Sequence, residues 1–231
     1  MALYTDAAMV LYYDIEGDNA DHDDWHTREH FEERLSIPGF ERASRWIATT
    51  GVPRYMVIYE VRGTDIAVSP DYLARLNNPT PWTTEMMPRF RGMVRGFTSI
   101  IASAGFGYGR AALAIRFTPT EGQEIRLRDK LESEVFPAIM SCRGVTSVQL
   151  MQPAPAPPMT KEQSIRGEDK TLDWLLLTTA YEADTLEAIR DEYLSKQFFE
   201  EFGNSSPQDI GFYSLHYIAT SQEVNRTAIN T

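Results

Sequence analysis

The stretch from Asp23 to Trp46 concentrates the side chains of this chain that can move a proton at neutral pH. The chain has 4 histidines, and His22, His26 and His30 lie in this stretch or just before it. His26 and His30 are four residues apart, so a helix places both on one face, one turn apart. An imidazole with an ordinary pKa near ~6.5 takes up and returns protons at neutral pH. The pattern favours His30 as a general acid or base, with His26 orienting it or selecting its tautomer.

Two arginines begin the strand expected after this helix. Alternation along a strand places Arg42 and Arg45 on opposite faces, so one of them points toward the inner side of the sheet. There a guanidinium would hold a carboxylate or stabilise a developing enolate or phenolate. We therefore predict both as candidate catalytic residues.

Large aromatic side chains and the fourth histidine are candidate substrate contacts. Each aromatic ring has plain core packing as its alternative role, and the histidine a hydrogen-bonded core position. The candidates are Trp25, Trp46, Tyr13, Tyr59, Trp82, Phe90 and His216. Trp82 and Phe90 belong to a proline-punctuated segment that forms either an apolar lid or a hydrophobic cluster under a loop.

A metal site at the histidine pair has little support in the sequence. The spacing of His26 and His30 suits two ligands on one helical face, but the string "HTREH" has its glutamate at the wrong place for the zinc-protease pattern. No cysteine or second histidine cluster supplies a convincing further ligand. We predict no metal, with a divalent ion at this pair as a minor alternative.

The bulk composition bounds the partners. The 231 residues carry a formal net charge of -11, which disfavours nucleic acid and anionic membranes as partners. One cysteine, Cys142, excludes an intramolecular disulfide, and no apolar run reaches the ~18 residues of a membrane span. We expect a cytoplasmic protein, a monomer or a homodimer, that acts on a small molecule.

The order of expected elements repeats once along the chain. The first half runs strand 7–15, helix from about Asp24 to Ser36 capped by Asp23 or Asp24, strands 40–50 and 53–63, helix 69–77 and strand 91–105. The second half runs strand 110–119, helix 125–140, strands 144–153 and 172–183, helix 185–202 and strand 211–221. Gly39 and Gly144 occupy equivalent turns, 144 − 39 = 105 residues apart.

Each half therefore has the β-α-β-β-α-β order of a ferredoxin-like unit, and we predict an α+β fold. One face of each four-stranded sheet needs a cover, which the other copy supplies in a barrel whose two sheets meet face to face. We assign residues 1–105 to the N-terminal half and 106–220 to the C-terminal half. Residues 153–170 form a Pro-rich insertion, expected to be a stiff segment followed by a flexible loop, and 221–231 a frayed polar tail.

The run "WHTREHFEERLSIPGFERASRW" after a first strand resembles the EthD-like branch of the dimeric α+β barrel superfamily. The resemblance covers nearly the whole chain as two fused repeats, and it places His30 at the position of the family's helix histidine. The family follows that histidine with a small residue and proline, where this chain has Phe31-Glu32. The resemblance implies cofactor-free oxygenases, decarboxylases or dehydratases on aromatic or polyketide-like compounds. The family also includes haem-binding members and proteins of no known activity. A haem-binding role here would need His26 or His30 as the axial ligand.

We expect the N-terminal half to carry the site. At the same offset of 105 the C-terminal half has Leu131 for His26 and Val135 for His30, so the histidines are not part of the repeat. The leading hypothesis is a cofactor-independent lyase, decarboxylase, dehydratase or isomerase that uses His30 on an oxygenated aromatic or cyclic substrate. A cofactor-free or haem-dependent monooxygenase is the first alternative, and a non-catalytic ligand-binding or stress-associated barrel the second. The site is expected to face a dry chamber between the two sheets.

Overall fold

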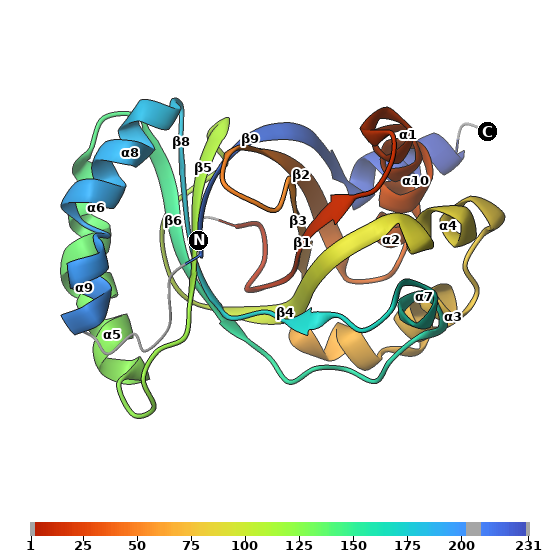
Figure 1. The fold of residues 1–231 in the computed structure, drawn as a ribbon, viewed down its shortest axis with the longest axis horizontal. Coiled ribbons are helices and arrows are strands. Elements are labelled where there is room, and N and C mark those ends of the chain that lie inside the picture. The colour runs from red at the N-terminus through yellow and green to blue at the C-terminus, as the bar shows by residue number, and fades with distance from the viewer. Residues whose placement is uncertain (1–2, 202–208, 230–231) are drawn as a thin grey trace.

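A computed structural model describes residues 3–201 and 209–229, which form a closed antiparallel barrel with helical layers on two opposite sides (Figure 1). The barrel strands are β1 (Ala7–Ile15), β2 (Phe40–Thr50), β3 (Tyr55–Val61), β4 (Phe90–Gly105), β5 (Ala111–Phe117), β6 (Val145–Pro153), β8 (Trp174–Ala180) and β9 (Asp209–Thr220). They follow the order β1-β3-β2-β9-β5-β8-β6-β4, and β4 pairs again with β1 to close the ring. The predicted α+β fold of two fused ferredoxin-like repeats is confirmed.

The halves join at two antiparallel strand pairs, β2 with β9 and β4 with β6. The long strand β4 pairs with β1 through its first part and with β6 through its second part, and therefore belongs to both sheets. The two-residue strand β7 (Lys170–Thr171) adds to β4 in parallel, outside the ring.

Apart from the insertion 153–170 and the segment after residue 220, the helices of each half cover the outer face of its own sheet (Figure 1). The α-helices are α1 (Asn19–Trp25), α2 (Phe31–Leu35), α3 (Pro70–Asn77), α4 (Pro81–Met86), α5 (Glu124–Lys130), α6 (Phe136–Ser141), α7 (Lys161–Arg166), α8 (Ala183–Glu192), α9 (Lys196–Glu201) and α10 (Ser221–Ile229). Short 3₁₀ segments cover Thr64–Val68 and Met87–Arg89, and π-helical turns cover His26–His30 and Leu131–Val135. The helix expected to end at Phe202 is described only to Glu201. Every helix of the described residues is too short or too polar to cross a membrane.

Side chains from both halves fill the barrel interior. Tyr12, Trp46 and Met56 of the N-terminal half pack with Leu175 and Tyr213 of the C-terminal half, each at most 3% exposed. Interiors packed in this way leave no room for a substrate. The expectation of a dry chamber between the two sheets is therefore wrong, because the residues expected to line it interlock.

The histidines lie on the other face of the N-terminal sheet, where α1 and α2 cover it. Strand alternation sends Tyr12 into the barrel and Met9 and Tyr13 toward the helices, where they join Trp25 and Phe31 in a second core. The histidine site therefore belongs to the layer between sheet and helices.

Three local predictions differ from the structure. The first helix begins at Asn19, not near Asp24, because the Asp18 carboxylate accepts the Ala20 N–H at 2.9 Å and caps it. Within the insertion, 161–166 forms helix α7 where a flexible loop is expected. In the expected polar tail, 221–229 forms helix α10, whose Glu223 accepts from the Thr220 N–H; residues 230–231 lie outside the described part.

Helix α7 crosses to the other half of the molecule. It follows β6 of the C-terminal half in the chain, yet it lies beside α3 in the helical layer of the N-terminal half (Figure 1). The insertion thus brings side chains of the second repeat to the histidine site of the first.

Candidate functional site

A π-helical turn sets the positions of the histidines. The Phe31 N–H donates to the carbonyl of His26, five residues back, so this turn holds one residue more than an α-helical register would. Side chains four residues apart then lie nearly above one another. The wider turn therefore places both His26 and His30 on the buried side of the helix.

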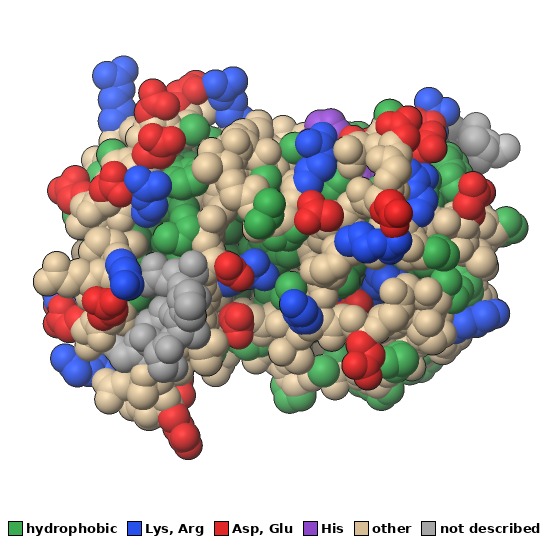
Figure 2. All heavy atoms as spheres, in the orientation of Figure 1, with side chains coloured by type: hydrophobic (Ala, Val, Ile, Leu, Met, Phe, Trp, Pro, Cys, Tyr) green, Lys and Arg blue, Asp and Glu red, His purple; other side chains and the backbone are tan. Residues whose placement is uncertain are grey.

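Three imidazoles form a buried stack along this helix. The ring centroids of His22 and His26 are 5.2 Å apart, those of His26 and His30 are 5.5 Å apart, and the Trp25 ring lies 4.4 Å from His30. His22 is 0% exposed, His26 3% and His30 8%. Little histidine surface reaches the face of the molecule drawn in Figure 2. The three imidazoles therefore do not form a polar helix face that solvent satisfies.

Hydrogen bonds fix the tautomers of the first two histidines. His22 lies with Nδ1 3.1 Å from an Asp23 carboxylate oxygen, which can only accept, and Nε2 3.1 Å from the Tyr13 hydroxyl. His22 is therefore protonated at Nδ1 and accepts from Tyr13. His26 has the opposite tautomer: Arg45 Nη1 donates to its Nδ1 at 3.3 Å, and its Nε2–H donates to the Tyr59 hydroxyl at 3.1 Å.

Arg45 ties the histidine helix to the sheet. Its guanidinium also donates to the Asp23 carbonyl at 3.1 Å, to Thr27 Oγ1 at 3.0 Å and to His216 Nδ1 at 3.1 Å. The side chain is 3% exposed, and such a planar, multiply bonded cation fixes the spacing between the helix and β2. In this geometry Arg45 positions the imidazoles.

His30 differs from the other two because its Nδ1 is buried and, among the described residues, has no hydrogen-bond partner. The nearest acceptor is a Glu33 carboxylate oxygen at 3.6 Å, one turn further along the helix. The ring lines a small cavity of about 20 Å³, which is enough for one water molecule. Its other lining residues are Met9, Leu11, Arg34, Tyr59, Tyr72, Leu76, Arg95, Glu162, Gln163 and Arg166.

The insertion closes this cavity through a buried ion pair. Arg34 Nη2 donates to a carboxylate oxygen of Glu162 in α7, and the two side chains are 5% and 4% exposed. The pair joins residues 128 positions apart. A buried pair with both partners present is tolerated, whereas one partner alone is costly. Glu162 therefore anchors α7 over His30.

The electrostatics keep the stacked imidazoles neutral. Burial is the largest cause that lowers the pKa of all three below the ordinary 6.5, and for His26 and His30 the pKa lies well below it. The nearby Arg34 guanidinium lowers the pKa of His30 further, while Glu162 opposes that effect. At neutral pH the His30 ring is thus uncharged and able to accept a proton.

Several predicted site residues lie elsewhere or in the supporting core. Arg42 and Trp46 are on the barrel-interior face, where Arg42 Nε donates to Glu60 at 2.7 Å and the Trp46 indole N–H donates to Ser44 Oγ at 2.9 Å. The structure does not bring them to His30. Alternation predicts the opposite faces of Arg42 and Arg45 correctly.

The remaining predicted contacts surround the helix. The Trp25 indole N–H donates to a Glu29 carboxylate oxygen at 3.1 Å. The ring centroids of Phe90 and Tyr13 are 4.7 Å apart, and the half-buried Trp82 packs against the same core. The Trp82–Phe90 segment is therefore a core cluster. His216 is exposed at a bulge of β9, which turns Leu215 inward and Tyr217 toward Phe31.

Neither metal nor haem fits the arrangement of side chains. Among the described residues no group of three or more His, Cys, Asp or Glu is placed to hold a metal ion. Both ring nitrogens of His26 are engaged, and the about 20 Å³ beside His30 is far too small for a porphyrin.

Comparisons with known proteins place the fold. No family model matches the chain, and no curated protein matches it. Solved structures do match. An anthrone oxidase-like protein superposes with a TM-score of 0.66 over 93% of each chain at 8% identity. A putative monooxygenase from Lactobacillus acidophilus superposes with a TM-score of 0.58 at 10% identity, and the match covers 93% of this chain and 96% of that chain. A putative chlorite dismutase superposes with a TM-score of 0.52 at 10% identity, and the match covers 96% of this chain and 97% of that chain.

These neighbours are ferredoxin-like α+β barrels, and this chain shares that fold with them. At identities of 8 to 10% the likeness extends to the fold alone. Membership of the EthD-like branch stays a prediction.

Sequence reasoning missed the residues that complete the cavity: Arg34, Tyr72, Arg95, Glu162 and Arg166. A signal for α7 was present, because Thr160 and Gln163 have the spacing of a capping box and form one in the structure. No local pattern indicates that this helix docks on the other half.

Proposed function

We propose that this protein is a small-molecule enzyme whose first chemical step is proton removal by His30 from an oxygenated aromatic or cyclic substrate. The observation that carries the proposal is the buried, uncharged His30 ring with an unpaired Nδ1, beside a cavity lined by three arginines. A neutral imidazole accepts the proton, and the guanidinium groups of Arg34, Arg95 and Arg166 would stabilise the enolate or phenolate that forms. These arginines replace Arg42 and Arg45 in that role.

Glu33 stabilises the His30 imidazolium that forms when the ring has taken the proton. Its carboxylate lies 3.6 Å from His30 Nδ1, so a newly formed imidazolium gains an ion partner. The low pKa of His30 favours return of the proton to product or water. The ring can therefore cycle between its two states within a turnover.

Two fates of the deprotonated substrate are consistent with this step. In the leading hypothesis the carbanion expels a leaving group from the neighbouring carbon, as in a dehydratase or another lyase. In a decarboxylase, the carbon that loses CO₂ would instead take up a proton from the His30 imidazolium. In the second, the deprotonated carbon is oxidised by O₂, which becomes a hydroperoxide; loss of water then leaves a carbonyl group. The names of the fold neighbours, an anthrone oxidase-like protein and a putative monooxygenase, favour the oxygen-consuming route.

The test measures turnover of two compounds under air and under nitrogen: anthrone, which can be oxidised by O₂, and 3-hydroxy-1-tetralone, which loses water to give 1-naphthol after proton removal. Oxygen uptake that matches product formation identifies the monooxygenase, and turnover under nitrogen identifies the lyase class. We expect His30→Ala to lower kcat by about 10²- to 10⁴-fold. Added imidazole should restore part of the rate by entering the vacated space.

The matched control is Lys130→Gln, on the corresponding helix of the C-terminal half, where Lys130 pairs with exposed Glu134. It should turn over as the parent does. Equal rates for His30→Ala and the parent would contradict the proposal. Retained binding of these compounds without turnover would favour the ligand-binding alternative.

A further inference from the structure

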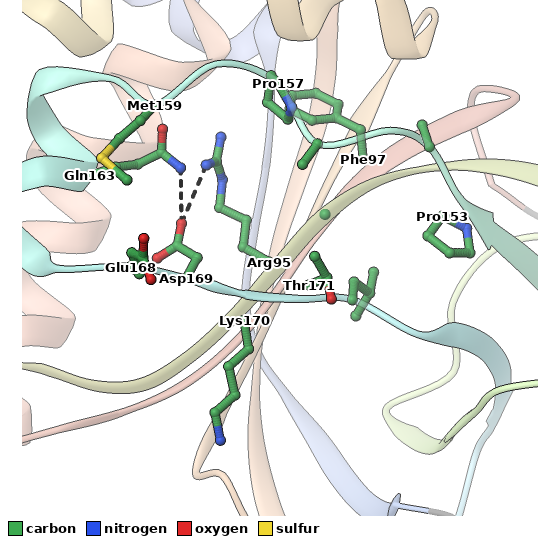
Figure 3. A pocket seen from close by; sticks show the side chains of 14 residues that line it. Arg95, Phe97, Pro153, Pro157, Met159, Gln163, Glu168, Asp169, Lys170 and Thr171 are labelled. Carbon is green, nitrogen blue, oxygen red and sulfur yellow. Dashed lines mark hydrogen bonds and ion pairs between the residues drawn. The ribbon is translucent and has the colours of Figure 1, made fainter. Parts of the chain in front are cut away.

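A second, larger hollow lies next to the His30 cavity. It measures about 350 Å³ and separates β4 from the Pro-rich segment 153–159 and the chain after α7 (Figure 3). Phe97, Pro153, Pro157 and Met159 give it apolar walls, and polar side chains gather at one end. This volume is in the range of small-ligand pockets.

Two side chains divide the hollow from the His30 cavity. Arg95 and Gln163 line both spaces. In Figure 3 both point at the carboxylate of Asp169, which holds them together. If they move, the two spaces become one chamber that leads to His30.

The buried charges around the two spaces do not balance. Arg34, Arg95 and Arg166 supply three cations, whereas Glu162 and Asp169 supply two anions, and each of these side chains is at most 9% exposed. The exposed Glu168 and Lys170 at the rim have opposite charges, and Glu33 near His30 pairs with Arg75 at 3.5 Å. An unbalanced buried charge is costly, and an anionic ligand removes that cost.

The hydrogen bond between Arg95 and Asp169 is longer than the other hydrogen bonds of these two side chains. Arg95 Nη1 is 3.5 Å from the Asp169 carboxylate, while Arg166 donates to it at 3.0 and 2.7 Å and Gln163 at 3.0 Å. Asp169 therefore keeps three shorter hydrogen bonds when Arg95 leaves. Arg95 also keeps its Nη2 bond to the hydroxyl of Tyr72, which lines the His30 cavity.

We propose that this hollow is the docking site for an aromatic compound with one carboxylate or phenolate group, whose anionic oxygen replaces Asp169 on Arg95. The ring lies against Phe97 and the prolines, and its anionic group lies on Arg95, a residue that also lines the His30 cavity. This inference rests on the proposed function only in naming the bound compound as substrate; the binding site stands without it.

The test uses 2-naphthoate as the anionic probe and 2-naphthamide as its uncharged match, titrated into the full chain at pH 7.5 by calorimetry. Methyl resonances of the methionines report the location, and we expect Met159 to shift. The carboxylate should bind at least ten-fold more tightly than the amide. Arg95→Gln should weaken its binding about ten-fold, and Asp169→Asn should tighten it, because the competing carboxylate is removed.

Lys170→Gln, at the exposed rim of the hollow, is the matched control for general attraction, because the Lys170 side chain extends away from Arg95 and Asp169 in Figure 3. Equal affinities for the two probes, no binding of either, or weaker binding in Asp169→Asn would overturn the proposal. An affinity loss in Lys170→Gln as large as that in Arg95→Gln would do the same.

His30→Gln separates this inference from the proposed function. It should bind 2-naphthoate as the parent does while losing turnover. Binding in the hollow without turnover by the parent would remove the enzyme and leave the binding site in place. Turnover without binding in the hollow would remove this inference alone.

Discussion

The two halves of this barrel share a helix geometry but fill it with opposite chemistry. The π turn of His26–His30 has its counterpart at Leu131–Val135, 105 residues later, with the same backbone bond to a buried Phe at the next position. All stacked positions are buried in both halves. The N-terminal half holds His22, His26 and His30 there, and the C-terminal half Leu127, Leu131 and Val135.

The strands facing those helices differ in the same way. Arg45 pairs with Val57 in the N-terminal half, and the corresponding pair in the other half is Leu150 with Leu176. Tyr59 pairs with Ala43, and its counterpart Thr178 pairs with Val148. The π turn is thus a property of the fold, because both copies have it. The polar stack is specific to one copy and carries the functional proposal.

The largest expected effect is the pH dependence of stability, which the histidines impose on one half only. The folded state keeps the three imidazoles neutral, so below about pH 6.5 the unfolded chain binds more protons and the free energy of unfolding falls. Each histidine contributes up to about 1.4 kcal/mol per pH unit, and together they contribute up to about 4. Above pH 7 both states are uncharged at these sites and the dependence ends.

Urea unfolding between pH 5 and 7.5 measures this slope. Giving the N-terminal half the residues of the other copy, His22→Leu with His26→Leu and His30→Val, should remove most of it. His216→Gln, at the exposed histidine, should remove a much smaller part of it, because partial burial lowers the pKa of His216 as well. A triple variant that keeps the parental slope would show that acidic groups control this pH range.

Glu162 gives the next largest effect, because its ion pair with Arg34 holds α7 of the C-terminal half on the helical layer of the N-terminal half. Glu162→Gln leaves Arg34 buried and uncompensated, a cost of about 3–5 kcal/mol. We expect α7 to detach, which limited proteolysis within residues 154–169 detects. The exposed Glu168→Gln is the control. Arg34→Met combined with Glu162→Met should restore protection, because neither charge then remains buried alone.

The architecture was readable from the sequence because it depends on repeated patterns. The apolar strands, the Pro-Gly stop at Gly39 and its copy at Gly144 predict the duplicated β-α-β-β-α-β order. The site was readable only in part. The histidine cluster is local in the chain, but its burial depends on one extra residue in a helical turn, which side-chain periodicity does not reveal.

Long-range docking accounts for the rest. Glu162 reaches Arg34 across 128 residues, and the bulge at His216 reverses the faces of β9 against simple alternation. Both follow from how the halves assemble. The chamber was misplaced for the same reason: large residues such as Trp46 and Tyr12 fill the barrel, and the cavity beside His30 lies between the N-terminal sheet and its helices.

Arg45→Leu copies Leu150 of the other half and is expected to cost about 1–3 kcal/mol of unfolding free energy. The variant removes the donors to the Asp23 carbonyl and to Thr27 Oγ1, and it leaves the buried acceptor His26 Nδ1 unpaired. Adding His26→Leu removes one of those acceptors, so the double variant should lose less than the sum of the single variants. A strictly additive cycle from urea unfolding would show that Arg45 and His26 do not interact.

The smallest effects should have opposite signs in the two halves. Tyr59→Phe leaves the Nε2–H of His26 without an acceptor and should cost about 1 kcal/mol. Thr178, its counterpart, has a buried hydroxyl with no partner among the described residues, so Thr178→Val removes an unpaired group at nearly constant volume. That variant should be neutral or gain up to about 1 kcal/mol. Paired urea titrations at pH 7.5 resolve the signs, and a loss of equal size in both variants would mean that the polar groups of this layer do the same work in each half.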